Sequence, residues 1–323
     1  MKAIQIPAFG GVEVLRLVEI ERPAPKDGEV LIQVKAAALN PVDSKIRNGY
    51  LKDIIPLPLP LVPGWEASGI IVQSRLSGFS AGDEVVTRVP FQRGGGYAEF
   101  MIAGEGEVVK KPSGLGFVEA ASLPIVAGAA YTLLYVLGSV KAGDRLFLLG
   151  AGGSIGWYAV QMAKKLGVTV IGSATGEDID ALRGLGIDEV VDYSVAGYLD
   201  GVGAVDLALD FVGGRAQEAL MGVVKKGGLL LSTVHPPSEE KAAAAGIKAS
   251  FASTDLDRSI METVLDWAVK GVMKVRIGKV LPLERAAEAL RLMDERKVGG
   301  KIVLVVDQKV SGKAFGDRAG ELA

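Results

Sequence analysis

The chain has 323 residues, of which 49% are hydrophobic and 23% charged, and its formal net charge is -2. A single hydrophobic core usually stops growing at roughly 250–300 residues, so this length predicts two domains. Nucleic-acid binding needs a clustered basic face, which this charge balance does not indicate, and we expect no nucleic-acid partner. There is no cysteine and only one histidine, His235. Disulfides and thiolate zinc sites are therefore excluded, and a catalytic zinc, with typically about three protein ligands, is disfavoured.

Two segments bear on the cellular compartment of the protein and on membrane association. Residues 1–6 lack the apolar core of a signal peptide, and the absence of cysteine fits a reducing compartment, so we expect a cytoplasmic protein. The stretch Ala120–Val140 carries no charge, and a membrane span needs about 20 apolar residues. Because Pro124, Gly138 and several hydroxyl residues interrupt it, we interpret it as a buried helix and expect no membrane association.

The first third of the chain is rich in short strands. Predicted strands over Glu29–Lys35, Gly69–Gln73 and Glu84–Val89 are separated by glycine- and proline-containing turns. Short strands at regular spacing indicate a small barrel.

The middle of the chain alternates between strands and helices. Strands are predicted over Arg145–Leu149, Val168–Ser173, Glu189–Tyr193, Val205–Phe211 and Gly228–Val234, and helices over Ser154–Leu166 and Ile179–Leu185. This alternation indicates βαβ units and a parallel sheet, although it leaves the strand order open.

The last part contains two predicted helices and two predicted strands. The helices cover Arg258–Lys270 and Leu283–Glu295, and the strands cover Lys274–Leu281 and Lys301–Val306. The tail Asp307–Ala323 has no clear pattern, and we expect it to fray.

A glycine-rich turn lies between the strand Arg145–Leu149 and the helix that follows it. Its residues are Gly150, Ala151, Gly152, Gly153, Ser154, Ile155 and Gly156. Glycines at such a turn permit a tight bend, close approach of the backbone to a pyrophosphate, and tight helix–strand packing. The helix N-terminus offers free N–H groups to phosphates. The spacing G-x-x-G-x-x-G differs from the usual G-x-G-x-x-G, so a helix-capping loop that binds nothing is the alternative to a dinucleotide site.

The end of the second strand bears on cofactor choice. Preference for NAD normally needs an acidic residue about 20 residues beyond the turn, and Ser173 stands there instead. Ser173, Thr175 and Tyr193 could donate hydrogen bonds to a 2′-phosphate, which favours NADPH over NADH. Glu177 and Asp178 would repel that phosphate if they lay close to it.

With these residues in view, the chain resembles the medium-chain dehydrogenase/reductase superfamily, in its zinc-free quinone oxidoreductase-like branch. The resemblance extends from Met1 to about Val306. Besides the glycine turn it rests on residues 40–43, 63–69, 95–100, 123–124, 191–193, 206–214, 226–228, 281–289 and 300–304.

The resemblance implies a mixed α/β fold with two domains. A GroES-like β-barrel domain comprises residues 1–122 and 273–323, and a Rossmann domain with a doubly wound parallel sheet comprises residues 123–272. The resemblance also implies that the active site lies in a cleft between the two domains and that the protein is a homodimer. Two departures are visible: the cysteine and histidine ligands of zinc-dependent relatives are missing, and Ala129 stands where many relatives have threonine.

Four residues fall near the nicotinamide or the substrate by family position: Asn40, Asp43, Lys45 and Tyr50. Asn40 could hold the carboxamide or the substrate oxygen, and Tyr50 or Lys45 could donate a proton. The alternatives are turn chemistry for Asn40 before Pro41, a surface pair of Asp43 with Lys45, and half-buried packing for Tyr50.

Other residues are expected at the cofactor. Phe251 and Lys301 fall where relatives contact it, and Val212 is placed with them, while Lys301 could instead be a solvated residue at a strand start. His235 follows a predicted strand on the side where open sheets bind ligands, with a simple loop role as the alternative. Glu66 matches a glutamate beside the metal in zinc-dependent relatives and is interpreted here as structural.

These observations predict an enzyme, an NADPH-dependent reductase that transfers a hydride to a quinone or α,β-unsaturated carbonyl without metal. Its partners are small molecules. Two alternatives stay open. One is an NADPH-binding redox sensor or interaction protein with little turnover, and the other is a metal-dependent alcohol dehydrogenase, against which the missing cysteines count.

Overall fold

The computed structural model describes residues 1–254 and 257–306, so the predicted fraying tail lies outside the described residues. Within them the chain forms two compact units. The first comprises residues 1–125, 257–271 and 275–306, and the second comprises residues 126–254 and 272–274. Each unit is described by itself below.

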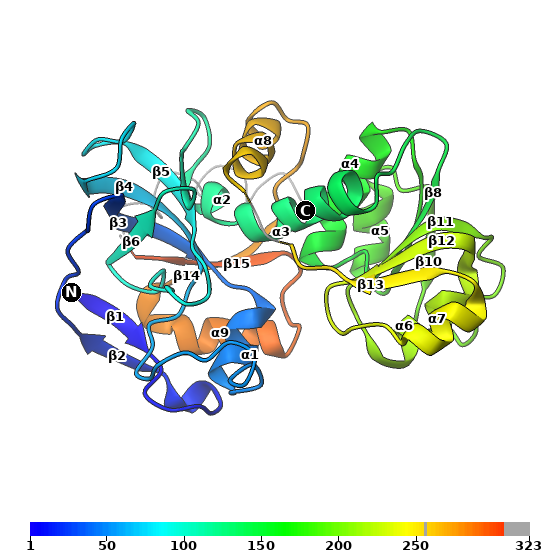
Figure 1. Ribbon diagram of the computed structural model, residues 1–323, viewed down its shortest axis with the longest axis horizontal. Coiled ribbons are helices and arrows are strands. Elements are labelled where there is room, and N and C mark those ends of the chain that lie inside the picture. The colour runs from blue at the N-terminus through cyan, green and yellow to red at the C-terminus, as the bar shows by residue number, and fades with distance from the viewer. Residues whose placement is uncertain (255–256, 307–323) are drawn as a thin grey trace. The chain divides into compact units, whose positions relative to one another are not determined.

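The first unit is built on a seven-stranded sheet in which the long strand β3 (Glu29–Ala38) is central (Figure 1). The sheet order is β14-β15-β3-β4-β5-β7, and β6 also pairs with β3. The other strands of this unit are β1 (Lys2–Gln5), β2 (Arg16–Glu19), β4 (Glu66–Ser74), β5 (Glu84–Arg88), β6 (Phe100–Gly104), β7 (Val108–Lys110), β14 (Ile277–Pro282) and β15 (Lys301–Val305). Every strand pair that involves β3, β4 or β5 is antiparallel.

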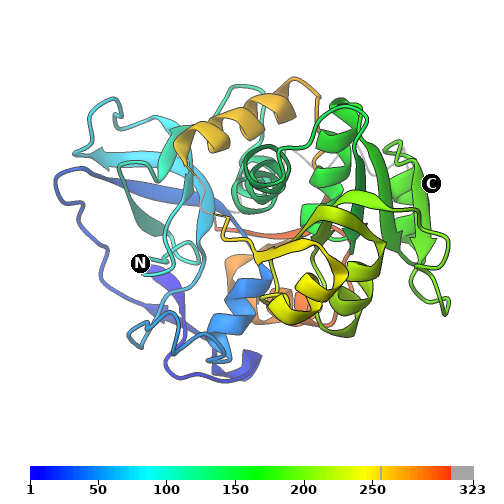
Figure 2. The same ribbon diagram turned by 45° about the vertical axis from the view of Figure 1, so that its right-hand side comes forward.

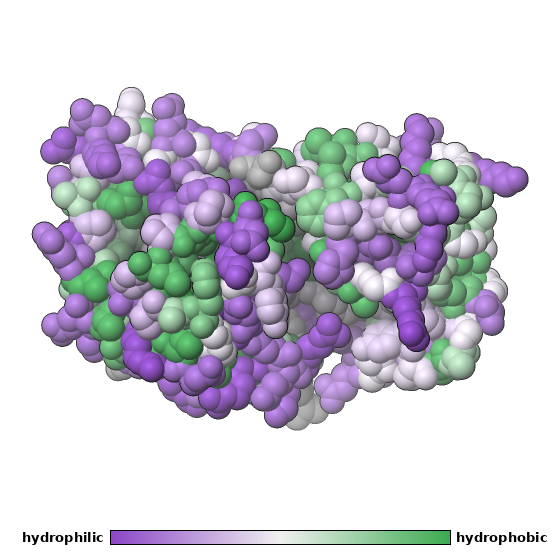
Figure 3. All heavy atoms as spheres, turned by 60° about the horizontal axis from the view of Figure 1, so that its bottom comes forward, coloured by the Kyte–Doolittle hydropathy of each residue, from purple (hydrophilic) through white to green (hydrophobic). Residues whose placement is uncertain are grey.

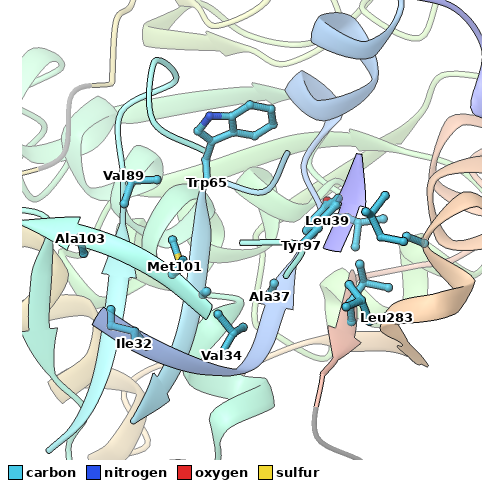
Figure 4. Close-up of a cluster of buried hydrophobic side chains, with 14 of the residues drawn as sticks. Ile32, Val34, Ala37, Leu39, Trp65, Val89, Tyr97, Met101, Ala103 and Leu283 are labelled. Carbon is cyan, nitrogen blue, oxygen red and sulfur yellow. The ribbon is translucent and has the colours of Figure 1, made fainter. Parts of the chain in front are cut away.

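Side chains of this sheet enclose a large apolar core. Figure 4 shows part of it, with Leu39, Trp65, Tyr97, Met101 and Leu283 in the same buried cluster. The Trp65 indole N–H donates to the Phe91 carbonyl at 3.0 Å, which satisfies its one polar group. This core holds the helices η1 (Val12–Val14), α1 (Pro41–Arg47), η4 (Leu283–Arg285) and α9 (Ala286–Asp294) in place. The helix α2 (Phe117–Ala121) packs into a second, smaller cluster with side chains of β3 and β15.

The second unit is a six-stranded parallel sheet in the order β10-β9-β8-β11-β12-β13. Figure 1 draws α4 and α5 on one side of the strands and α6 and α7 on the other. The strands are β8 (Arg145–Leu149), β9 (Thr169–Ala174), β10 (Glu189–Asp192), β11 (Val205–Asp210), β12 (Val224–Ser232) and β13 (Lys248–Phe251). The helices are α4 (Ser154–Lys165), α5 (Glu177–Arg183), α6 (Gly214–Leu220), η3 (Met221–Val223) and α7 (Glu239–Ala245). Strand order reverses between β8 and β11, where doubly wound sheets bind ligands.

Local sequence explains the central β8–α4 unit. Four of the five residues of β8 are buried, as expected for a strand covered on both faces. Along α4 the apolar side chains Trp157, Val160 and Met162 are buried, whereas Lys164 and Lys165 occupy the last turn, where positive charge complements the helix dipole.

The structure confirms the predicted strands and helices of the middle and last parts to within a few residues and adds short ones that were missed. The missed elements include β1, β2, α1, α6, α7 and β13. The division into units differs from the predicted one at α8 (Arg258–Val269), the gold helix of Figure 2. The sequence placed this helix in the dinucleotide domain, but it groups with the first unit, where the Arg258 guanidinium lies 5.7 Å from the Phe79 ring centre.

The uncharged stretch around Ala120–Val140 is divided among shorter helices. It contains the end of α2, then α3 (Pro124–Tyr131), then the π-helical η2 (Thr132–Leu137). No helix in the described part of the chain has the length and apolar character needed to cross a membrane. On the face shown in Figure 3, hydrophilic residues predominate and apolar residues lie among them in small groups, as is usual for folded domains.

Candidate functional site

The glycine turn of the second unit is fastened to the neighbouring strand. Gly150 has φ +86°, a conformation that glycine adopts without strain. Its N–H donates to the Ser173 hydroxyl at 2.9 Å, and the Ala151 N–H donates to the Ser173 carbonyl at 2.9 Å. Ser173 is buried, so the residue expected to meet a 2′-phosphate holds the turn in shape.

The turn leads directly into the N-terminus of α4. A Cβ on Gly156 would lie 2.5 Å from the Ala151 carbonyl oxygen, so only glycine permits this close packing of helix and turn. Gly153 precedes the helix, with no side chain that could cap the first N–H groups. Free N–H groups and the helix dipole together make this a site for an anion such as a pyrophosphate.

A buried carboxylate shapes the loop on the other side of the switch point. Asp210, at the end of β11, accepts hydrogen bonds from the N–H groups of Val212 and Gly213, from the Gln217 amide and from the Ser232 hydroxyl, at 2.7–2.9 Å. This holds the partly exposed Val212 against the turn, where its Cγ2 lies 3.0 Å from the position of a Cβ on Gly150. Sequence reasoning missed Asp210, although an acid that ends an apolar strand just before two glycines is a recognisable signal.

Most of the predicted cofactor residues of the second unit lie at one edge of its sheet. Gly150, Tyr193, Val212 and His235 follow the carboxyl ends of parallel strands, and Phe251 is the last residue of the parallel strand β13. Tyr193, Val212 and Phe251 are partly exposed and available for contact. The His235 ring packs near Gly213, with Cδ2 2.9 Å from the position of a Cβ on that glycine. Asn40 and Lys301, also predicted at the cofactor, belong to the first unit.

Thr175 has its own partner at this edge. The pKa of Asp192 lies below its ordinary value because its carboxylate accepts hydrogen bonds from the Ser194 N–H, the Ser194 hydroxyl and the Thr175 hydroxyl. Two of the three hydroxyl groups predicted to donate to a 2′-phosphate, those of Ser173 and Thr175, are therefore engaged within the protein.

A buried network in the first unit joins Asn40, Glu66 and Lys301. The Lys301 ammonium donates to the Leu39 carbonyl at 2.6 Å, to Asn40 Oδ1 at 2.8 Å and to Glu66 Oε1 at 2.8 Å. The Asn40 amide donates to Glu66 Oε1 at 2.8 Å, and the Ile125 N–H donates to Glu66 Oε2 at 2.8 Å. Lys301 is only 3% exposed, so all three of its N–H groups are used inside the protein.

A second buried pair, Asp43 with Tyr97, lies in the same unit. The Tyr97 hydroxyl donates to Asp43 Oδ2, which also accepts from the Asn40 N–H at 3.1 Å. Burial raises the pKa of Asp43 to about 7 despite these hydrogen bonds, and it raises the pKa of Tyr97 well above its ordinary value, with the Asp43 charge adding to the effect. Asp43 Oδ1 is buried and has no hydrogen-bond partner.

The four residues predicted to act in catalysis thus separate into two kinds. Asn40 and Asp43 are 2% and 1% exposed and bonded to other protein groups. The alternative of a surface pair of Asp43 with Lys45 is therefore wrong. Tyr50 is 76% exposed and Lys45 is partly exposed, so these two can reach a small molecule. The alternative of half-buried packing for Tyr50 is wrong as well.

Among the described residues, no group of three or more histidine, cysteine, aspartate and glutamate side chains is arranged to hold a metal ion. Glu66, which matches a glutamate beside the metal in zinc-dependent relatives, instead faces the Lys301 ammonium.

Comparison with known proteins agrees with this geometry. Residues 26–113 match the alcohol dehydrogenase GroES-like domain, and residues 185–304 match the zinc-binding dehydrogenase family. The chain is 31% identical to quinone oxidoreductase of Sus scrofa over 95% of its own length and 98% of the relative. The chain belongs to the medium-chain dehydrogenase/reductase superfamily, in its zinc-free quinone oxidoreductase-like branch. The predicted fold class, a Rossmann sheet with a GroES-like domain, is confirmed.

Other members of the superfamily are similar as well. The quinone-oxidoreductase homolog of Spinacia oleracea is 37% identical, but the match spans 60% of this chain and 61% of that relative. Among solved structures, the quinone oxidoreductase from Coxiella burnetii is 29% identical, covers 95% of this chain and 99% of its own, and has a TM-score of 0.88. A mycobacterial protein solved with NADPH is 29% identical with a TM-score of 0.83, covering 94% of this chain and 99% of its own. A protein described as an NAD-dependent alcohol dehydrogenase is 30% identical with a TM-score of 0.85, and the match covers 95% of this chain and 100% of that protein. These matches support a nicotinamide cofactor for this superfamily member.

Proposed function

We propose that this chain is a reductase that takes a hydride from a nicotinamide dinucleotide and delivers it to a quinone or an α,β-unsaturated carbonyl without a metal. The observation that carries the proposal is the glycine turn Gly150–Gly156, held by Ser173 at the switch point of a doubly wound sheet. The names of the superfamily relatives, among them quinone oxidoreductases, support the acceptor class.

The bound dinucleotide would supply the hydride from its nicotinamide ring. The second unit would hold the pyrophosphate on the N–H groups of the turn and of the first residues of α4. A hydride adds two electrons to the substrate and a proton completes the product, which is a quinol or a saturated carbonyl compound.

The protein must stabilise the negative charge that grows on the substrate oxygen during this transfer. Zinc does so in metal-dependent dehydrogenases by acting as a Lewis acid. Among the four residues predicted to act in catalysis, Tyr50 and Lys45 carry accessible O–H and N–H groups, and we propose that one of them donates to the substrate oxygen. We assign a structural role to the buried network of Asn40, Glu66 and Lys301, because their polar groups form hydrogen bonds with one another.

Turnover assays test the proposal. Purified protein is mixed with reduced dinucleotide and a panel of quinones and α,β-unsaturated carbonyls, and oxidation of the cofactor is followed by absorbance, with and without a chelator. We expect at least one acceptor to be reduced at a rate that the chelator does not change. Cofactor binding without any turnover would favour a redox sensor, and activity that is lost with the chelator and restored by zinc would refute the metal-free mechanism.

We also propose that the protein is a homodimer. The strand β13 lies at one end of the six-stranded sheet and, among the described residues, pairs only with β12. An exposed sheet edge of this kind can pair with a second chain. Light scattering coupled to size-exclusion chromatography should give twice the chain mass, and a monomeric mass at micromolar concentration would contradict the proposal.

A further inference from the structure

One carboxylate lies directly against the glycine turn. A Cβ built on Gly152 would lie 2.6 Å from Asp178 Oδ2 and 2.9 Å from the Asp178 Cβ. The φ angle of Gly152 is not in the left-handed region, so its backbone conformation does not require glycine. The Asp178 side chain therefore provides a steric reason for glycine at this position.

Asp178 lies where doubly wound folds bind the adenosine ribose of a dinucleotide. It belongs to α5 and comes four residues after the end of β9. In doubly wound folds the pyrophosphate lies on the glycine turn, and the adenosine ribose lies toward the carboxyl end of the second strand, where an acidic residue holds its 2′-hydroxyl. Ser173 occupies the usual place of that acid, but Asp178 brings a carboxylate to the same side of the turn from the following helix.

The charge around this corner opposes a phosphate. Three carboxylate residues, Glu177, Asp178 and Asp192, lie at or just beyond the carboxyl ends of β9 and β10, and Arg183 is the one cation in the sequence between Ser173 and Ser194. Arg183 pairs with Asp180 at 2.9 Å, so its charge is already matched. A 2′-phosphate carries up to two negative charges and would be repelled by the three carboxylates at this edge.

The hydroxyl groups that were expected to receive a 2′-phosphate do not offset this repulsion. Ser173 is buried under the turn, and the Thr175 hydroxyl donates to Asp192, one of these three carboxylates. Of the three predicted donors, Tyr193 is the most exposed, at 51%, and Thr175 is partly exposed.

We propose that Asp178 accepts a hydrogen bond from the 2′-hydroxyl of the adenosine ribose and makes this chain select NADH over NADPH. The inference rests on the proposed function, because it assigns the specificity of the same cofactor site. It departs from the NADPH preference that Ser173 indicated in the sequence. The acid that discriminates the two cofactors comes from the helix after the second strand instead of from the strand end.

Direct binding measurements test this assignment without any substrate. Isothermal titration calorimetry with NADH and NADPH gives both dissociation constants for the wild-type chain and for Asp178→Asn, which removes the charge and keeps the shape. We expect the wild type to bind NADH at least about tenfold more tightly, as one unfavourable charge contact of roughly 1.4 kcal/mol implies. In Asp178→Asn this preference should fall by about tenfold or more, mainly through tighter NADPH binding.

Two further variants make the result specific. Asp180→Asn removes a charge from the same helix whose carboxylate pairs with Arg183, and it should keep most of the NADH preference. Asp178→Glu restores a carboxylate and should keep the preference for NADH over NADPH.

The outcomes separate the two proposals. A wild-type chain that binds NADPH as tightly as NADH, or an Asp178→Asn variant with unchanged preference, overturns the assignment of Asp178, even if quinones are reduced. A chain that binds neither dinucleotide overturns the proposed function together with this inference. If Asp178→Asn does not fold, the ratio of the NADH and NADPH dissociation constants of the wild-type chain still tests the predicted preference for NADH, and Asp178→Glu tests the role of the carboxylate.

Discussion

The buried ion pair between Lys301 and Glu66 leads to a quantitative prediction about the first unit. Lys301→Met keeps the length and apolar stem of the side chain but removes its ammonium group. Three acceptors then lose a donor: Glu66 Oε1, Asn40 Oδ1 and the Leu39 carbonyl. Glu66 is fully buried, so water cannot replace the lost partner without disturbing the core.

The expected loss follows from these contacts. Removing one partner of a buried ion pair typically costs about 3–5 kcal/mol, because the remaining charge is left uncompensated. The three lost hydrogen bonds are short, which places Lys301→Met at the upper part of this range. Glu66→Gln combined with Lys301→Met removes the remaining charge and keeps one carbonyl oxygen that can accept from the Ile125 N–H. We therefore expect the double variant to be more stable than Lys301→Met alone.

Urea unfolding measures these differences. Far-ultraviolet circular dichroism and tryptophan fluorescence should be recorded together, because two units can unfold in separate transitions. Trp65 lies in the core of the first unit and Trp157 lies on α4 of the second unit, so the fluorescence reports on both units. Lys279→Met is the matched control, since Lys279 lies on the adjacent strand β14 and is exposed. The reasoning is refuted if Lys301→Met is no less stable than Lys279→Met, or if the double variant is less stable than Lys301→Met.

Three other predictions follow from the site geometry. Because burial raises the pKa of Asp43 from 3.8 to about 7, the folded state holds its proton more tightly than the unfolded state does, and stability should fall as pH rises from about 4 to about 7. Asp43→Asn should flatten this dependence in melting curves recorded across that pH range. Gly156→Ala places a Cβ 2.5 Å from a backbone oxygen of the turn and should weaken dinucleotide binding at least about tenfold, whereas Gly222→Ala, which meets no atom within 4 Å, should not. Tyr50→Phe and Lys45→Met should leave stability and dinucleotide affinity unchanged, and the variant that loses the donor to the substrate oxygen should lower kcat by roughly 10²–10⁴.

Each of these has an outcome that would count against it. A melting temperature of the wild type that rises between pH 4 and pH 7 in step with that of Asp43→Asn would show that Asp43 does not control the titration. Equal dinucleotide affinity in the Gly156→Ala and Gly222→Ala variants would remove the turn from the binding site. Unchanged kcat in both Tyr50→Phe and Lys45→Met would indicate that solvent supplies the proton.

The sequence by itself determined the features that depend on neighbouring residues. The apolar run Arg145–Leu149, the glycine turn and the amphipathic helix after it are encoded within about 20 consecutive residues, and the structure reproduces them closely. Local patterns predicted the alternation of strands and helices for the same reason. Short elements such as α1 and β13 were missed, because a few residues give too little periodicity to separate them from loops.

Only the tertiary structure decided the roles of individual polar residues. Lys301 meets Asn40 across 261 residues of sequence and Glu66 across 235, so no local pattern could show that its ammonium group is fully used in the interior. Ser173 and Asp178 lie close together in the sequence, yet their roles depend on where β9 and α5 place them beside the turn. Hydrogen bonds and charges act over a few ångströms in space, and the fold alone determines which side chains come within that distance.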